Sequence, residues 1–270
     1  MLYYEQDGTK VFPNTDIKGG VAVTLRDAKR IIGPIGVFVP SKEIKSVLEK
    51  AGAQSIDDSL TDIADSSNVY DLNNIYKDHP DFRKYIADGG RHAQLKTNVL
   101  NINPIFTDRP TEEDDLMVYG LVSGKRGYKY CHRRYLKSNH KSLKKFKVLV
   151  PKAAGSGQFG EALPPMIIVG PDIAFTQTFI SIGTFDNEKE ANSLHKYLKT
   201  KFARTLLYVL KVTQDNLPSA WRCIPKQDFT STSDINWEKP ISEIDKQLYQ
   251  KYNLSSDEIA FIESHVKEMT

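Results

Sequence analysis

The chain has 270 residues, of which 40% are hydrophobic and 10% aromatic, so it is long enough to bury the core of one large domain or two small ones. Charged residues make up 26%, and no apolar run approaches the roughly 18 residues of a membrane helix, which excludes a disordered or membrane-spanning chain. The first residues lack the pattern of a secretory signal, so we expect a cytoplasmic protein. Cys131 and Cys223 are too few for a disulfide framework and are expected to be free thiols.

The N-terminal part of the chain is predicted to contain two strands, one helix and a long irregular segment. Residues 21–25 are an apolar run after a Gly-Gly break and predict a buried strand, and residues 31–39 predict a second strand. Residues 41–51 carry apolar side chains at helical spacing, with Ser41 as the N-cap. The polar, Pro- and Gly-interrupted pattern of residues 52–115 predicts short helices and loops.

A hairpin is predicted next, over residues 116–130, where two Val- and Tyr-rich runs flank a Gly-containing turn. Three further strand-like runs follow it. They cover residues 146–151, 166–169 and 175–182.

The apolar period changes to that of a helix from Asp186 onward. Apolar residues recur every three or four positions as far as about Val212, which predicts one long amphipathic helix. Two more helices are expected over residues 241–252 and 256–267, the second preceded by Ser255 at capping-box spacing from a glutamate. Strands followed by helices predict an α+β protein, with a mixed, sheet-containing recognition domain before a helical C-terminal part.

Charge is concentrated in the basic segment, residues 125–147 (KRGYKYCHRRYLKSNHKSLKKFK). It contains ten Lys or Arg, no Asp or Glu, and four interleaved aromatic residues. A solvated face of an ordinary domain would also give a run of charge, but the missing acidic residues and the aromatics favour contact with nucleic acid. Phosphate contacts position a protein, whereas base-edge contacts specify a sequence. The residue types suited to reading bases are Arg133, Arg134, Asn139 and Lys141.

A glycine-rich stretch, residues 155–160 (GSGQFG), follows the basic segment. It fits neither the phosphate-binding loop of NTPases nor the dinucleotide-binding fingerprint. Two interpretations stay open: a loop at the DNA surface, with Ser156 and Gln158 as contacts, or a linker.

A second kind of chemistry is suggested by Asp16-Ile17-Lys18, which has the acidic-x-Lys spacing of metal-dependent nucleases. The alternative function is therefore an Mg²⁺-dependent restriction endonuclease subunit that cleaves DNA itself with Asp16 and Lys18. Glu5 and Asp7 are the only acidic residues upstream. The six histidines show no paired metal-ligand spacing, so no metal ligand is assigned.

Several short motifs together carry a family resemblance. They are Val11-Phe12-Pro13 followed by Asp16-Ile-Lys-Gly-Gly20, and the segments 147–157 (KVLVPKAAGSG), 197–204 (YLKTKFAR), 211–214 (KVTQ), 224–229 (IPKQDF) and 244–254 (IDKQLYQKYNL). This set resembles the end of the catalytic domain and the TaqI-like specificity domain of adenine-specific type II restriction–modification DNA methyltransferases. The motifs are spread over most of the chain, and residues 52–115 are covered least.

The resemblance implies roles for particular residues. Phe12 matches the position whose ring stacks on an adenine flipped out of the duplex, although a core phenylalanine at a strand entry would look the same. Lys199, Lys201 and Arg204 match a pattern that implies contact with the DNA backbone or bracing between domains. No Asn-Pro-Pro-Tyr motif occurs, since the sequence at Asn103 departs from it at the third position. A glycine-rich loop for S-adenosylmethionine is also missing.

The sequence thus predicts closing strands of a methyltransferase-like domain at 1–40, a DNA target-recognition domain at 41–184 and a helical C-terminal part at 185–270. The expected function is sequence-specific recognition of duplex DNA, which presents a target adenine to methyltransferase or endonuclease modules in the same polypeptide or another subunit. S-adenosylmethionine and Mg²⁺ are implied for that parent system, not for this chain alone. The predicted DNA contacts are Lys125, Arg126, Lys129, Arg133, Arg134, Asn139, Lys141, Lys144, Lys145, Ser156, Gln158, Lys199, Lys201 and Arg204.

Overall fold

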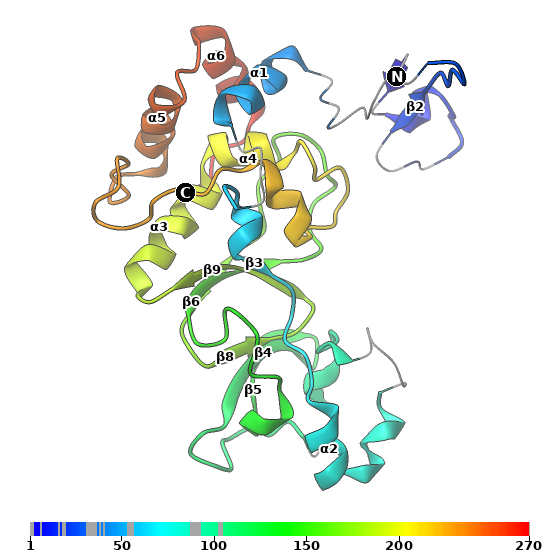
Figure 1. Cartoon of the computed structure of the whole chain (residues 1–270), viewed down its shortest axis with the longest axis vertical. Helices are drawn as coiled ribbons and strands as arrows, with labels where there is room; N and C mark the ends of the chain where they lie inside the picture. Colours follow the sequence, from blue (N-terminus) through cyan, green and yellow to red (C-terminus); the bar gives the residue numbers. More distant parts are fainter. Residues whose placement is uncertain are drawn as a thin grey trace.

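The protein has an α+β fold, as the sequence predicts (Figure 1). The computed structural model describes residues 3–5, 7–15, 17, 20–30, 37, 39, 41–52, 57–86, 93–101 and 105–269. The strands are β1 (Tyr3–Glu5), β2 (Val21–Val23), β3 (Ala64–Asp65), β4 (Leu116–Val122), β5 (Lys125–Cys131), β6 (Phe146–Pro151), β7 (Ile167–Val169), β8 (Ile173–Phe175) and β9 (Phe179–Phe185). The α-helices are α1 (Lys42–Ala51), α2 (Leu72–Asp78), α3 (Glu188–Lys199), α4 (Lys201–Leu207), α5 (Ile241–Lys251) and α6 (Ser256–His265). Short 3-10 helices include η2 (Leu60–Ile63), η3 (Pro80–Lys84), η5 (Val99–Asn101), η6 (Arg133–Tyr135) and η7 (Pro218–Cys223).

Two sheets form the middle of the molecule. The first is antiparallel with the strand order β3-β9-β6-β7, and the second has the order β5-β4-β8, in which β4 pairs antiparallel with β5 and parallel with β8. β8 lies in one sheet and β9 in the other, so the chain crosses between the sheets over residues 176–178. A small third sheet, β1-β2, stands apart from the helices in Figure 1.

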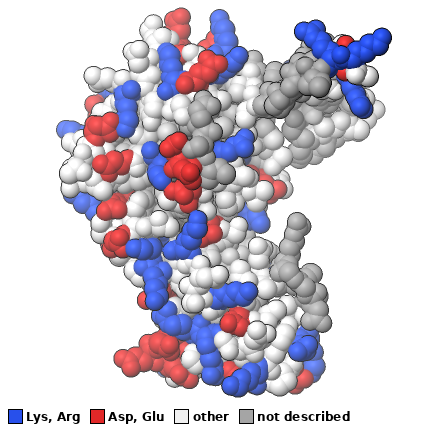
Figure 2. All heavy atoms as spheres, viewed as in Figure 1, with Lys and Arg blue, Asp and Glu red and all other residues white. Residues whose placement is uncertain are grey.

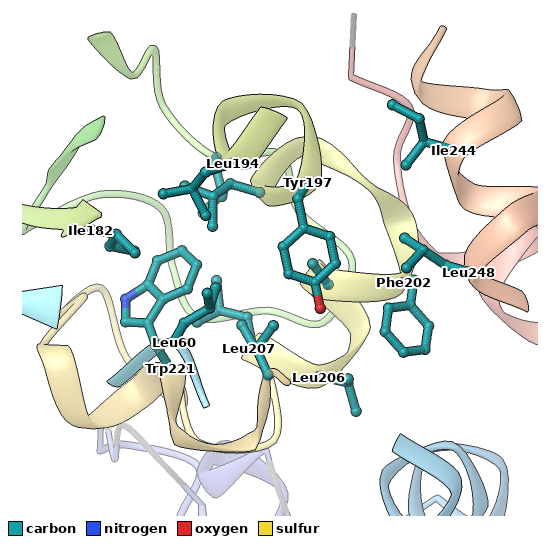
Figure 3. Packing of buried hydrophobic residues seen from close by; sticks show 14 of the residues in the cluster. Leu60, Ile182, Leu194, Tyr197, Phe202, Leu206, Leu207, Trp221, Ile244 and Leu248 are labelled. Atoms are coloured by element: carbon teal, nitrogen blue, oxygen red, sulfur yellow. The ribbon is translucent and has the colours of Figure 1, made fainter. Parts of the chain in front are cut away.

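The largest hydrophobic core lies between the four-stranded sheet and helices α3 to α6. Helix α3 packs on β6, β7 and β9, while α4 contacts α1, α5, α6 and η7. Within this core, the rings of Phe202 and Tyr252 are stacked with their centroids 4.7 Å apart. Figure 3 shows ten labelled buried members of this core: Leu60, Ile182, Leu194, Tyr197, Phe202, Leu206, Leu207, Trp221, Ile244 and Leu248.

A second core lies under the three-stranded sheet, in the lower half of the molecule in Figure 1. It is built from residues between Tyr70 and Leu143, together with Ala174. The fully buried Leu95, Val118 and Leu136 are among its members. The largest core contains residues on both sides of position 184, and the domain boundaries at 40 and 184 stay predictions.

Most predicted elements are confirmed. The hairpin is β4–β5, the helix after Ser41 is α1, and the last two helices are α5 and α6, with a complete capping box between Ser255 and Glu258. The strand-like run over 175–182 corresponds to two strands, because β8 ends at Phe175 and β9 begins at Phe179. Residues 57–86 contain only short elements, as expected. Cys131 and Cys223 are free, buried thiols.

The predicted single helix over residues 186–212 is wrong, because α3 ends and α4 begins on either side of Thr200. This residue is extended (φ −59°, ψ 148°), and its side chain accepts a hydrogen bond from the Ala203 N–H. The buried carboxylate of Asp245 accepts the first two N–H groups of α4, at 3.0 and 2.9 Å. The helical spacing of apolar residues continues through this break, so it does not reveal the break. The capping side chains of Thr200 and Asp245 stabilise the start of a new helix there.

The predicted strand at 21–25 forms as β2, but its predicted burial is wrong. Ala22 and Val23 are exposed, because β2 pairs with the three-residue strand β1 and, among the described residues, no second layer covers the pair. The second predicted strand, 31–39, lies almost entirely outside the described residues. Among the helices that the structure describes, none has the length and apolar character needed to cross a membrane.

Replacing Leu194 with alanine tests the main core. The side chain is fully buried between α3 and the sheet, so the cavity is expected to lower the free energy of unfolding by about 2–5 kcal/mol. Urea denaturation measures this change. Asn192→Ala, on the exposed side of the same helix, is the matched control and should shift it by no more than about 0.5 kcal/mol. Equal effects of the two substitutions would contradict the packing described here.

Candidate nucleic-acid interface

The basic segment occupies an edge strand and the loop that follows it. β5 is the outer strand of the three-stranded sheet, η6 comes next, and residues 136–145 lead into β6. Across the β4–β5 pair, Arg126 lies opposite Leu121 and Tyr128 opposite Tyr119. These side chains therefore lie on the face of the sheet that carries Tyr119, the face turned toward β9.

Arg126 and Tyr128 form a partly exposed aromatic and cationic surface where the two sheets meet. The Tyr128 ring lies 4.8 Å from that of Tyr119, which in turn lies 5.1 Å from Phe179. The Arg126 guanidinium is 5.3 Å from the Phe179 ring and donates a hydrogen bond to the Pro165 carbonyl at 3.3 Å. Tyr128 is 43% exposed, so one face of its ring is open to a ligand.

Acidic partners for much of the basic segment come from elsewhere in the chain, although the segment itself contains none. Lys129, Arg133 and Arg134 pair with Asp108, Asp172 and Asp78, respectively, and Lys145 pairs with Asp186. Lys147 is fully buried, donates to three backbone carbonyls, and has its pKa lowered to about 8 by burial. Tertiary contacts thus supply acidic partners for four of these cations, and the fifth, Lys147, is buried away from any ligand.

Four lysines of the basic segment lie free on the surface. Each is exposed and forms no ion pair with any residue that the structure describes: Lys125, Lys137, Lys141 and Lys144. Asn139 is exposed among them, with both its amide donor and its acceptor open to solvent. Figure 2 shows Lys and Arg side chains forming a band from the middle of the molecule to its lower end. Lys137 was not among the predicted contacts, although the same charge pattern includes it.

The glycine-rich stretch folds around the chain's own carboxylate. Glu161 accepts hydrogen bonds from the Ser156 and Gly157 N–H groups and from the Ser156 hydroxyl, at 2.9–3.1 Å. It also pairs with the buried Lys211 at 3.3 Å. Backbone N–H groups that could hold a phosphate are therefore already occupied. Gln158 remains exposed beside this loop.

The cations of the α3–α4 junction brace the protein. Arg204 is 1% exposed and donates to the carbonyls of Lys199, Glu161 and Lys267, so its predicted contact with DNA is corrected to a structural role. Lys201 pairs with Glu263 at 2.5 Å and is mostly buried. Of the two roles that the resemblance implies for Lys201 and Arg204, bracing is the one that their contacts support.

Phe12 lies in the segment between β1 and β2 and is 50% exposed, so it is not a core residue of the described structure. Asp16 and Lys18, the predicted nuclease pair, lie outside the described residues, as does Asn103. Phe12, Ser156 and Gln158 form no hydrogen bond or ion pair with the basic segment among the described residues.

Comparison with known proteins finds no family model and no curated protein that matches this chain. Function is therefore inferred from the surface described above and from the short motifs of the sequence.

Glu161→Gln tests whether the carboxylate organises the glycine-rich loop. Burial raises the pKa of Glu161, but the hydrogen bonds from Ser156 and Gly157 lower it more, to about 2. At neutral pH the substitution is expected to cost about 1.5–3 kcal/mol, as for other hydrogen bonds to charged groups. Because the folded-state pKa is depressed, this stabilisation is present above about pH 4.5 and disappears as the pH falls toward 2.

Chemical denaturation at pH 7 and at pH 3 measures the difference between the wild type and Glu161→Gln. The difference should shrink at the lower pH. Glu113→Gln, at an exposed position, is the control and should have a small effect at both values. A pH-independent cost for Glu161→Gln would contradict the assigned role.

Proposed function

We propose that this protein binds duplex DNA through the surface formed by Lys125, Lys137, Asn139, Lys141 and Lys144, and serves as the target-recognition part of a restriction–modification system. One observation carries the proposal: most charges near this surface are paired with acidic residues, whereas these four lysines are exposed and unpaired among the described residues. A lysine without an acidic partner contributes most to the free energy of DNA binding, because its contact with a phosphate releases counterions condensed on the DNA.

The side chains of this surface divide into two roles. A lysine ammonium group is a point charge that suits a phosphate. The four lysines are distributed over an edge strand and a loop, so they match an extended ligand better than a small one. Asn139 has the donor and acceptor that pair with an adenine edge in the major groove. Adenine recognition agrees with the family resemblance of the sequence motifs, which is to adenine-specific methyltransferases.

The N-terminal segment supports the proposed partner, a methyltransferase or endonuclease module. Seven of the eleven exposed large apolar side chains of the described residues lie between residues 3 and 37, and exposed apolar side chains gathered in this way are typical of interaction surfaces. Tyr3, Phe12, Val23 and Leu25 are 51%, 50%, 46% and 67% exposed. We assign this segment to contact with the catalytic module, whose bound S-adenosylmethionine and Mg²⁺ would belong to the parent system.

The triple substitution Lys137→Gln, Lys141→Gln and Lys144→Gln tests the phosphate contacts. It is expected to weaken binding to a 30-base-pair duplex on the order of tenfold or more. The slope of log affinity against log salt should fall by about 2–3, since each lost contact contributes roughly 0.9. Fluorescence anisotropy over a range of salt concentrations measures both quantities.

A matched control removes three exposed lysines from the helical half: Lys42→Gln, Lys45→Gln and Lys246→Gln, whose side chains are 92%, 66% and 69% exposed. Both triple variants change the net charge equally. An equal loss of DNA affinity in the two triple variants would indicate an effect of net charge alone and would contradict the proposed surface.

Asn139→Ala tests sequence recognition separately from phosphate binding. A preferred target is first selected from random duplexes with the wild-type protein. The variant is then expected to lose about 1–3 kcal/mol of discrimination, or roughly 5- to 150-fold, between the selected and a scrambled duplex. Lys144→Gln should instead weaken both duplexes alike. If selection returns no preferred sequence, DNA binding stands but target recognition does not.

A further inference from the structure

We propose that Glu112, Asp114 and His132 bind one divalent transition-metal ion at the end of β5. Their ligand atoms, two carboxylate oxygens and one imidazole nitrogen, all lie within 4.8 Å of one another. Glu112 and Asp114 belong to the loop before β4, and His132 directly follows β5, so the β4–β5 hairpin brings the two segments together. The inference does not depend on DNA binding.

The imidazole of His132 is held between two carboxylates. Its Nε2 atom lies 3.4 Å from Glu112 Oε1, on the side of the proposed ion. Its Nδ1 atom faces Asp115 Oδ1 at 3.9 Å on the opposite side. Metal-binding histidines commonly have this arrangement, in which a carboxylate behind the ring accepts one N–H and leaves the other nitrogen free for the ion.

Asp115 lies directly behind the His132 ring and is held there by its other oxygen, Oδ2, which accepts hydrogen bonds from the Thr111 N–H and hydroxyl and from the Glu112 N–H. Its side chain is 1% exposed, and its Oδ1 atom is buried with no hydrogen-bond partner, as is Nδ1 of His132. Two buried polar atoms facing each other without a hydrogen bond are costly, and a small rotation of the ring would join them. An ion on Nε2 favours that rotation because it fixes the proton on Nδ1. Asp115 is thus a positioning residue for His132.

The charge around the cluster also favours a cation. The four consecutive residues 112–115 are all Glu or Asp, and two of them, Glu112 and Asp114, belong to the cluster. Arg133 is the nearest cation, and its guanidinium is directed to Asp172 at 3.0 Å and to the Asp114 carbonyl. Its Nε atom also forms an ion pair with Asp114 Oδ2 at 3.8 Å, so a metal ion would use the other carboxylate oxygen of Asp114.

The donor set indicates the class of metal. Imidazole with two carboxylates suits Zn²⁺ or Mn²⁺ better than Mg²⁺, which prefers oxygen ligands and retains its waters. Neighbouring Cys131 lies outside the cluster, because its side chain is buried in the second core. Ligands around Zn²⁺ lie about 3.4 Å apart, so the site must contract. Glu112 and Asp114 are each 58% exposed and can move to do so.

Titration of the purified chain with Zn²⁺, and with Co²⁺ as its spectroscopic substitute, tests the site. We expect one ion per chain, and affinity for Mg²⁺ at least 100-fold weaker. Glu112→Gln, Asp114→Asn and His132→Gln should each weaken Zn²⁺ binding tenfold or more. Asp115→Asn should weaken it and also change the visible absorption bands of bound Co²⁺, which a purely structural role would not do.

Glu113→Gln and His265→Gln are the controls, because these exposed residues have the same ligand chemistry outside the cluster. They should leave Zn²⁺ affinity unchanged. Glu112 and Asp114 are exposed, so their variants test the site even if His132→Gln does not fold, and circular dichroism monitors folding. Absence of Zn²⁺ binding, or binding that survives both carboxylate substitutions, would overturn the proposal, the second result indicating an adventitious ion elsewhere.

Discussion

The packing of Phe175 and Phe179 between the two sheets is the contact on which the placement of the basic segment depends. Both rings are buried, and they lie at the ends of the short crossing that joins β8 to β9. Asn68 fixes this crossing, since its side chain accepts the Phe175 N–H at 2.9 Å and its own N–H donates to the Phe175 carbonyl. The three-stranded sheet, which carries the basic segment, is therefore held against the four-stranded sheet by buried side chains at this crossing.

This junction also explains the setting of Tyr128. Its ring packs against Tyr119, and Tyr119 packs against Phe179 of the other sheet. A partly exposed ring that packs on a buried one has less rotamer freedom to lose on binding. Tyr128 thus offers an aromatic contact in the same segment as the lysines of the proposed DNA surface.

Charge pairing divides the basic segment into structural and available cations. Arg133 and Arg134, the most obvious base-reading candidates by residue type, are engaged with Asp172 and Asp78, whereas Lys141 and Lys144 are not engaged with any described residue. The acidic partners Asp108, Asp172, Asp78 and Asp186 lie outside the cluster around His132, and within that cluster Asp114 pairs with Arg133. The proposed DNA surface and the proposed metal site therefore use different side chains.

Much of the fold follows from local sequence patterns. The hairpin β4–β5, the cap of α1 and the capping box of α6 are all visible in the sequence, because each depends on residues within a few positions of one another. The exposed lysines of the basic segment are visible for the same reason. Glu112, Asp114 and His132 are not, since about twenty residues and two strands separate the acidic loop from the histidine.

Other features depended on contacts between distant parts of the chain. The break at Thr200 is capped by Asp245, and the buried Arg204 donates to carbonyls on both sides of it in the sequence. The Glu161 carboxylate in the glycine-rich loop is paired with the distant Lys211. The sequence by itself determined which residues are basic, most of the helices and strands from residue 116 onward, and the α+β class. The tertiary structure decided which cations remain unpaired, because pairing depends on side chains that folding brings within a few ångströms.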